Sequence, residues 1–221
     1  MFHRVDSLSI LGTGTLDGNE ASYWETTHDT TITFHFNFHN CNDVTITNIH
    51  ATAPEHSPYT DGIHLGKSDN VRINSANIAT GDSIGDGVTN VNITGVNCGP
   101  GHGISIGSLG QDEGEKEVRS IRGNIVNNVD NPIIIDQHYC PPKKCEGGDS
   151  SVSIEGVKFI DVRGSSITET GVKVDCSKSH PCKDIQLKGV SLTFKGKPTN
   201  ALCSSADVEF LGDDQTPSSC S

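Results

Sequence analysis

The sequence predicts an all-β protein built as a solenoid of stacked strands, and three observations lead to this prediction. An apolar pattern with residues at offsets 0, 2, 5 and 7 recurs along the chain. Glycine is frequent, at 24 of 221 residues, and Asn and Thr are abundant. The 3.6-residue apolar periodicity of an amphipathic helix is weak throughout. Together these features disfavour a helical repeat.

Each copy of the apolar pattern describes one coil. Residues at offsets 0 and 2 alternate as in a strand, so both side chains lie on one face. The step to offset 5 requires a turn or bulge before the alternation resumes. Two short strands separated by a bend, repeated every 20 to 33 residues, are typical of a β-solenoid whose coils bury their apolar side chains inward. A β-sandwich is the alternative, but fixed offsets in five copies fit it poorly. The copies begin at Val44, Val71, Val91, Val152 and Ile185, often just after an Asn or Asp.

Residues 1–221 are predicted to form one domain, because this length suits a single core. The tail, residues 195–221, is interpreted as a loop-rich cap over the open end of the solenoid, where unpaired strand edges would invite aggregation. No run of 18 or more apolar residues is present, so no membrane partner is expected. Met1–Asp6 lacks the charged start and apolar stretch of a signal peptide, and we expect a mature or partial chain, favouring a partial one.

The formal net charge is −12, and Lys and Arg are scattered, so a nucleic-acid partner is not expected. An acidic polysaccharide could bind only through a local basic cleft, against the charge of the whole protein. The charge could equally serve only to keep the surface soluble.

Eight cysteines include three neighbouring pairs, and none has the CxxC spacing of a zinc site. We therefore predict a disulfide framework, an oxidising compartment and no metal. One glycosylation sequon, Asn92-Ile93-Thr94, agrees with secretion. The pairs are Cys140 with Cys145, Cys176 with Cys182, and Cys203 with Cys220.

Three chemically active residues recur at about one coil length. Asp61, Asp82 and His102 are separated by 21 and 20 residues, and each has a neighbouring glycine. Residues one coil apart stack at roughly 5 Å, so the three are predicted to line up on one face. Two carboxylates and an imidazole suit glycoside hydrolysis, in which one carboxyl is the general acid and another acts on water or the sugar. A purely structural ladder of turn residues is the alternative.

Several strings resemble the plant polygalacturonases of glycoside hydrolase family 28, including exopolygalacturonases. The resemblance covers almost the whole chain. It implies a right-handed single-stranded parallel β-helix of the pectin-lyase-like type, here missing several coils. It also implies inverting hydrolysis of α-1,4 links in galacturonan without a cofactor, by a secreted, monomeric cell-wall enzyme. The matching strings are Gly12–Gly18, Thr60–His64, Cys98–Ser105, Gly107–Gly110, Asn131–Gln137 with Tyr139–Pro141, and Cys176–Ser179 before Pro181–Cys182.

The resemblance assigns roles to four residues. Asp82 matches the family's general acid, Asp61 matches an Asp that helps to activate water, and His102 matches the histidine that supports protonation of the acid. Tyr139 resembles the tyrosine that lines the sugar subsite.

The chain also departs from the family pattern. The family reads GDDCISIG where this chain has Gly81-Asp82-Ser83-Ile84-Gly85, so a second Asp and a Cys are absent. The absent cysteine bridges to the position of Cys98, so Cys98 is expected to be unpaired or to bond Cys41. The Arg-Ile-Lys motif that grips the substrate carboxylate is absent too, about one coil is missing near Ile121–Val126, and Tyr59 replaces an Asn. Arg119, Arg122 or Lys67 could partly replace that grip.

These departures leave competing functions. Polygalacturonate hydrolysis is the leading hypothesis, although the lost acid–base partner predicts weak or absent activity. An impaired or silent family member that binds pectin is the second. A pectin lyase is less favoured, because Asp213-Asp214 is too isolated to build its calcium site. A purely structural solenoid is least favoured.

Overall fold

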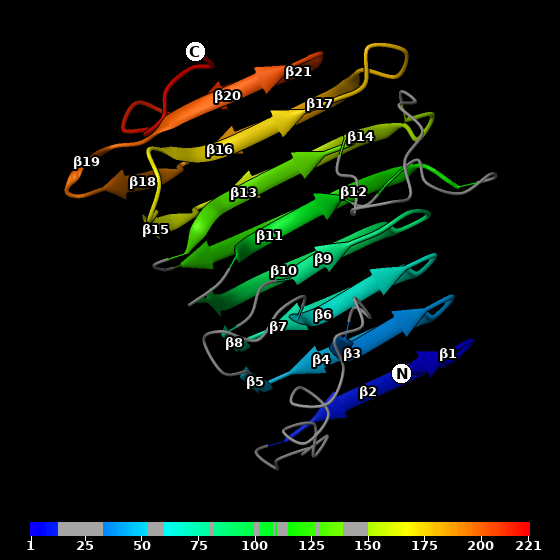
Figure 1. The fold of residues 1–221 in the computed structure, drawn as a ribbon. Helices are drawn as coiled ribbons and strands as arrows, with labels where there is room; N and C mark the ends of the chain where they lie inside the picture. Colours follow the sequence, from blue (N-terminus) through cyan, green and yellow to red (C-terminus); the bar gives the residue numbers. More distant parts are fainter. Residues whose placement is uncertain are drawn as a thin grey trace, which may run out of the picture.

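The structure, a computed structural model, describes residues 1–12, 33–52, 60–79, 82–99, 102–107, 109, 115–126, 129–138 and 150–221. Figure 1 shows the strands of this part stacked side by side from the N-terminal to the C-terminal end. Every strand pairing in it is parallel except one short antiparallel contact near the C-terminus. This arrangement confirms the predicted all-β parallel β-helix. Among the described residues there is no helix of the length and hydropathy that a membrane span requires.

The coils stack into one sheet of eight strands and one of 13. The eight-stranded sheet contains, in order, β1 (Phe2–His3), β3 (Thr33–His39), β6 (Thr60–Gly66), β9 (Asp82–Ile84), β11 (His102–Gly107), β13 (Asp130–Asp136), β16 (Thr170–Asp175) and β20 (Asn200–Ser204).

The 13-stranded sheet contains two successive ladders, because the chain bends within each coil. The first ladder runs through β2 (Asp6–Leu11), β4 (Asn42–Thr47), β7 (Asp69–Asn74), β10 (Thr89–Cys98), β12 (Val118–Val126), β14 (Ile154–Ile160), β17 (Cys182–Lys188) and β21 (Ala206–Leu211). The second contains β5 (His50–Thr52), β8 (Asn77–Ala79), the ends of β10 and β12, β15 (Arg163–Ser165), β18 (Ser191–Phe194) and β19 (Lys197–Pro198).

Left-handed backbone residues produce the bend that the apolar pattern predicted. Asn48, Ser75 and Gly95 have positive φ and stand at offset 4, directly before the residue at offset 5. A second set stands directly before the first apolar residue of the pattern and explains the Asn and Asp found there, since these residues adopt this conformation more readily than most. Its members are Asp43, Asn70, Asn90 and Asp184.

The copy of the apolar pattern that is predicted to begin at Val152 begins five residues later in the structure, at Val157. The structure pairs Val157, not Val152, with Ile185, and the left-handed Gly156 directly precedes Val157. The error arose because Val152 and Ile154 are also apolar and buried, so two registers satisfied the same spacing.

The tail contains a further coil of the solenoid. Residues 200–204 and 206–211 form β20 and β21, which pair with β16 and β17 as a further coil, so the prediction of a loop-rich tail is wrong for this stretch. The following residues return over that coil through bridges of Thr216 to Ser191 and Cys220 to Ala201.

Two of the predicted disulfides are confirmed, Cys176–Cys182 and Cys203–Cys220. Cys140 and Cys145 lie outside the described residues. Cys41 and Cys98 are buried and are not bonded to each other, so the alternative of a bond between them is wrong. Cys41 precedes β4, whereas Cys98 ends β10.

Gln137 joins three parts of the chain directly after β13. Its side chain is 2% exposed, its Nε2 donates to the carbonyl of Val152, and its Oε1 accepts from the amide of Ser177 at 2.8 Å. The glutamine of the motif Asn131–Gln137 therefore has a structural role: it satisfies two backbone groups of neighbouring loops.

We expect Gln137→Leu to lower the free energy of unfolding by roughly 2–4 kcal/mol, because each buried backbone group left without a partner costs about 1–3 kcal/mol. Thermal unfolding followed by circular dichroism measures the loss. The same substitution at Gln186, whose hydrogen bonds to Asp184 and Glu209 are exposed, is the control and should change stability little. Equal effects of the two substitutions would contradict this role.

Candidate active site

The fold brings three of the predicted site residues onto consecutive strands. Asp61 is the second residue of β6, Asp82 is the first of β9, and His102 is the first of β11. These strands are neighbours in the eight-stranded sheet (Figure 1), and each of the three residues is the first or second of its strand. Only their backbone is described, so the site is built here from register.

The register separates Asp82 from the other two. Asp82 pairs with Ile63 of β6 and with Ile104 of β11. Asp61 and His102 each stand two residues before those isoleucines, so they share one row of the sheet. Asp82 is therefore offset by two residues from the row of Asp61 and His102, and the alignment of the three on one face stays a prediction. The reason is coil length: the structural repeat is 19 residues from Ile63 to Asp82 and 22 from Asp82 to Ile104, and these do not match the sequence separations of 21 and 20.

This offset sets the backbone separation of Asp61 and Asp82. Asp61 and Asp82 lie on adjacent strands and two residues apart along them, which corresponds to roughly 8 Å between their Cα atoms. The carboxyl groups of inverting glycosidases stand about 6.5–9.5 Å apart, leaving room for a water molecule. The backbone spacing is thus of the size that an inverting pair requires.

A neighbouring strand dictates the glycine after His102. A Cβ atom on Gly103 would lie 2.0 Å from the carbonyl oxygen of Pro132, which is far inside van der Waals contact. The register between β11 and β13 also shifts here, between His102 and Ile104. Gly103 therefore allows β13 to approach the strand that carries His102.

His64 is a residue of this region that sequence reasoning missed. Its neighbours Ile63 and Leu65 are each 1% exposed in the core, so strand alternation places His64 on the outer face of β6. Burial, the largest cause, and the adjacent His39 together lower the pKa of His64 to about 4, although Asp86 partly opposes the shift. Its place in Thr60–His64, between two inward residues, was the available signal.

The lowered pKa of His64 predicts a pH-dependent stability. The unfolded chain binds this proton near pH 6.5 and the folded chain only near pH 4, so the stabilisation is complete above about 6.5 and is lost as the pH falls toward 4. The loss is on the order of 3 kcal/mol. Urea unfolding at a series of pH values should show a flatter profile for His64→Gln. The exposed His50 provides the control substitution, His50→Gln, and a wild-type slope in both variants would contradict the assignment.

Two of the three proposed replacements for the substrate grip can be placed. Lys67 follows β6, and its Nζ lies 3.9 Å from Asp86. Arg119 lies on β12 in the 13-stranded sheet and pairs with Glu117 at 2.6 Å and Glu155 at 3.8 Å, so it is not on the sheet that carries the site. Arg122 is on the same strand, and its side chain lies outside the described part.

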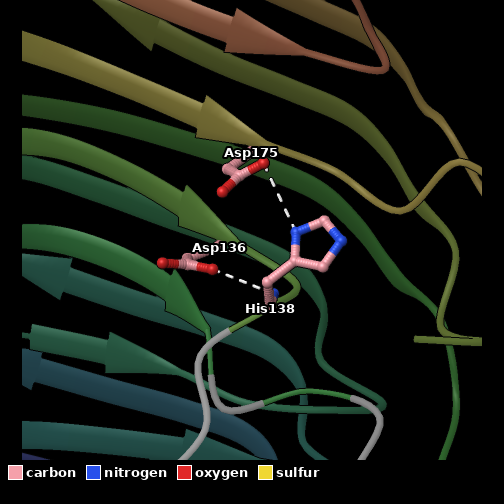
Figure 2. Close-up of side chains that lie close together, drawn as sticks. All are labelled: Asp136, His138 and Asp175. Atoms are coloured by element: carbon pink, nitrogen blue, oxygen red, sulfur yellow. Dashed lines mark hydrogen bonds and ion pairs between the residues drawn. The ribbon is translucent and has the colours of Figure 1, made fainter. Parts of the chain in front are cut away.

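A charged cluster lies where β13 and β16 of the eight-stranded sheet end. Figure 2 shows Asp175 directed at the ring of His138, where Nδ1 and the carboxylate are 3.3 Å apart, and Asp136 accepting from the backbone N–H of His138 at 2.9 Å. The group resembles a metal-ligand set, but the ammonium of Lys173 lies 2.7 Å from Asp136 and 3.8 Å from Asp175. The ammonium group of Lys173 thus already balances the two carboxylates of this cluster. Tyr139, the next residue after His138, lies outside the described residues.

The model of the family described as glycosyl hydrolases family 28 matches residues 27–124 and 122–211. An exopolygalacturonase of Platanus acerifolia is 34% identical over 96% of this chain and 74% of its own length. A polygalacturonase of Prunus persica is 36% identical over 99% and 72%, and an exopolygalacturonase of Oenothera organensis is 33% identical over 99% and 79%. This chain belongs to glycosyl hydrolase family 28. The resemblance seen in the sequence is therefore confirmed.

Two features of these matches concern the coils that this family 28 chain lacks. The alignment with the Prunus persica protein extends over 283 positions, although 99% of this chain is only about 219 of its 221 residues, so that relative has internal segments that this chain lacks. The two segments of the family match meet at residues 122–124, within β12. This is the place where the sequence predicted a missing coil.

Proposed function

We propose that this chain hydrolyses the α-1,4 links between galacturonate units of polygalacturonate, with inversion at the anomeric carbon. The observation that carries the proposal is the placement of Asp61, Asp82 and His102 on three consecutive strands of a family 28 β-helix. The two carboxylates stand on adjacent strands at a backbone offset compatible with an inverting pair.

Each residue has a proposed role. Asp82 is the general acid that protonates the leaving oxygen, and Asp61 accepts a proton from the attacking water. His102, on the strand at the other side of Asp82, supports the protonated state of the acid. Tyr139 is the proposed sugar-binding residue. The reaction needs no metal or other cofactor, since proton transfer between two carboxyl groups and water completes it.

We also propose that the protein acts outside the cell, on the pectin of the cell wall, as a monomer. The two disulfides support an oxidising compartment, because such bonds persist in secreted proteins. Two of the relatives reported above are named exopolygalacturonases, which supports release of single galacturonate units from a chain end.

The test is to incubate the oxidised, folded protein with polygalacturonic acid and to measure new reducing ends together with ultraviolet absorbance. Hydrolysis produces reducing ends without an unsaturated, absorbing product. A lyase would produce both signals in parallel, and a protein that only binds would produce neither. Chromatography of the products then distinguishes single units from longer fragments.

A further inference from the structure

The 13-stranded sheet carries the one N-glycosylation sequon of the chain, Asn92-Ile93-Thr94. The sequon lies in the middle of β10, where Ile93 is 1% exposed and belongs to the core. Strand alternation places Asn92 and Thr94 together on the opposite, outer face, and both are exposed. The two side chains that define an acceptor for an N-linked sugar are therefore on one side of the strand and open to solvent.

On the side of β7, the long side chain level with Asn92 is directed away from it. Asn92 pairs with Arg72 on β7 and with Arg122 on β12. The guanidinium of Arg72 lies 3.5 Å from a carboxylate oxygen of Asp43 on β4, which is the strand beyond β7 as seen from β10. Arg72 therefore leaves this side of the Asn92 amide uncovered.

Asn92 differs in its contacts from two other asparagines of β10. Nδ2 of Asn90 donates to Asp69 at 2.8 Å, and Nδ2 of Asn97 donates to Asn77 at 2.9 Å, so both side chains join adjacent coils. Within the part of the chain that the structure describes, the Asn92 side chain makes no such bond. A structural ladder explains the other two asparagines but not Asn92, whose amide is available for modification.

A large group on Asn92 would be attached away from the candidate active site. Asp61, Asp82 and His102 stand on β6, β9 and β11 of the eight-stranded sheet, whereas Asn92 stands on β10 of the other sheet (Figure 1). β10 lies between β7 and β12, inside its ladder rather than at either end of it. The group would therefore leave both the site and the stacking of the terminal coils undisturbed.

We propose that Asn92 carries an N-linked glycan, added as the chain enters the secretory pathway. This inference rests on the extracellular location that forms part of the proposed function. The co-reactant is an oligosaccharide linked to a lipid diphosphate. A bond forms between Nδ2 of Asn92 and the anomeric carbon, the bond from that carbon to the diphosphate oxygen breaks, and Nδ2 loses one proton. Because β10 is paired on both sides in the folded protein, the transfer takes place on the unfolded chain, before the coils stack.

The experiment is to express the full chain behind a cleavable secretory leader in eukaryotic cells. The intact mass of the secreted protein is measured before and after treatment with peptide-N-glycosidase in heavy-oxygen water. The wild type is expected to carry one glycan and to lose it on treatment, with the oxygen label at position 92 in the peptide map. Asn92→Gln and Thr94→Val should each abolish the added mass completely, because either change destroys the sequon.

Two matched variants serve as controls. Thr94→Ser keeps the sequon and should keep the glycan. Asn97→Gln changes another exposed asparagine of the same strand, outside the sequon, and should also keep it. Secreted wild-type protein with its unmodified mass would overturn the proposal, as would a glycan that persists in Asn92→Gln.

Hydrolysis of polygalacturonate is measured separately on the same samples. The glycosylated wild type and Asn92→Gln are expected to have equal rates, because the glycan is attached to the sheet that does not carry the site. A glycosylated protein that cleaves nothing would overturn the proposed function alone. An unmodified protein that cleaves the polymer would overturn the modification alone.

Discussion

Asp61→Asn is expected to lower the rate of polygalacturonate hydrolysis by ~10²–10⁴-fold, the usual contribution of a positioned acid or base. Asn has nearly the same shape as Asp but cannot accept a proton from the attacking water. Asp61 is the more informative carboxylate to remove, because the register places it in the same row as His102, whereas Asp82 stands in another row. Initial rates of reducing-end release measure the effect.

Asp184→Asn is the matched control. Asp184 lies on β17 in the 13-stranded sheet, is exposed, and has a left-handed backbone that Asn tolerates equally well. Its activity should equal that of the wild type. If Asp61→Asn kept full activity, Asp61 would have no part in activating water.

Inserting Asp-Cys-Ile between Asp82 and Ser83 is expected to raise the rate on the order of 10²-fold, at the lower end of the effect of one acid–base group. Ser83 and Ile84 already pair with His64 and Leu65, so the inserted residues fill the preceding positions. The new Ile falls level with Ile63 and Ile104, and the new Asp falls level with Asp61 and His102. The insertion therefore restores a second carboxylate in their row.

A second insertion, Asn-Cys-Ile, makes the same change in register without adding a carboxylate. Comparing the two insertions therefore isolates the effect of the carboxylate. Both insertions place the new Ile level with the buried Ile63 and Ile104, so the two variants share the same change in register. Only Asp-Cys-Ile should raise the rate. Equal rates for the two would mean that the second Asp contributes nothing.

The β-helix could be predicted because its apolar pattern is repeated and local. A left-handed residue at offset 4 turns the strand, and Asn, Asp, Ser and Gly at that point are visible in the sequence. The register of a single coil is harder to predict, since the apolar pattern can start at Val152 or at Val157. Only pairing with Ile185 on the next coil distinguishes them.

The candidate site residues could be proposed from the sequence, but the register that relates them could not. Residue separations of 21 and 20 predict a single row only if every coil contributes the same number of residues to its strands and bends. The coil ending at Asp82 is shorter at its strand pairing than the coil that follows it. His64 could not be predicted from the sequence because its lowered pKa depends on burial and on His39, a residue of another coil.

Time-resolved proton NMR of polygalacturonic acid with the wild-type protein tests the central claim most directly, because it detects cleavage and the configuration of the first product together. Inverting hydrolysis of an α link predicts that new reducing ends appear first as the β anomer and equilibrate afterwards. The absence of new reducing ends from folded, disulfide-bonded protein would contradict the account, as would first appearance of the α anomer.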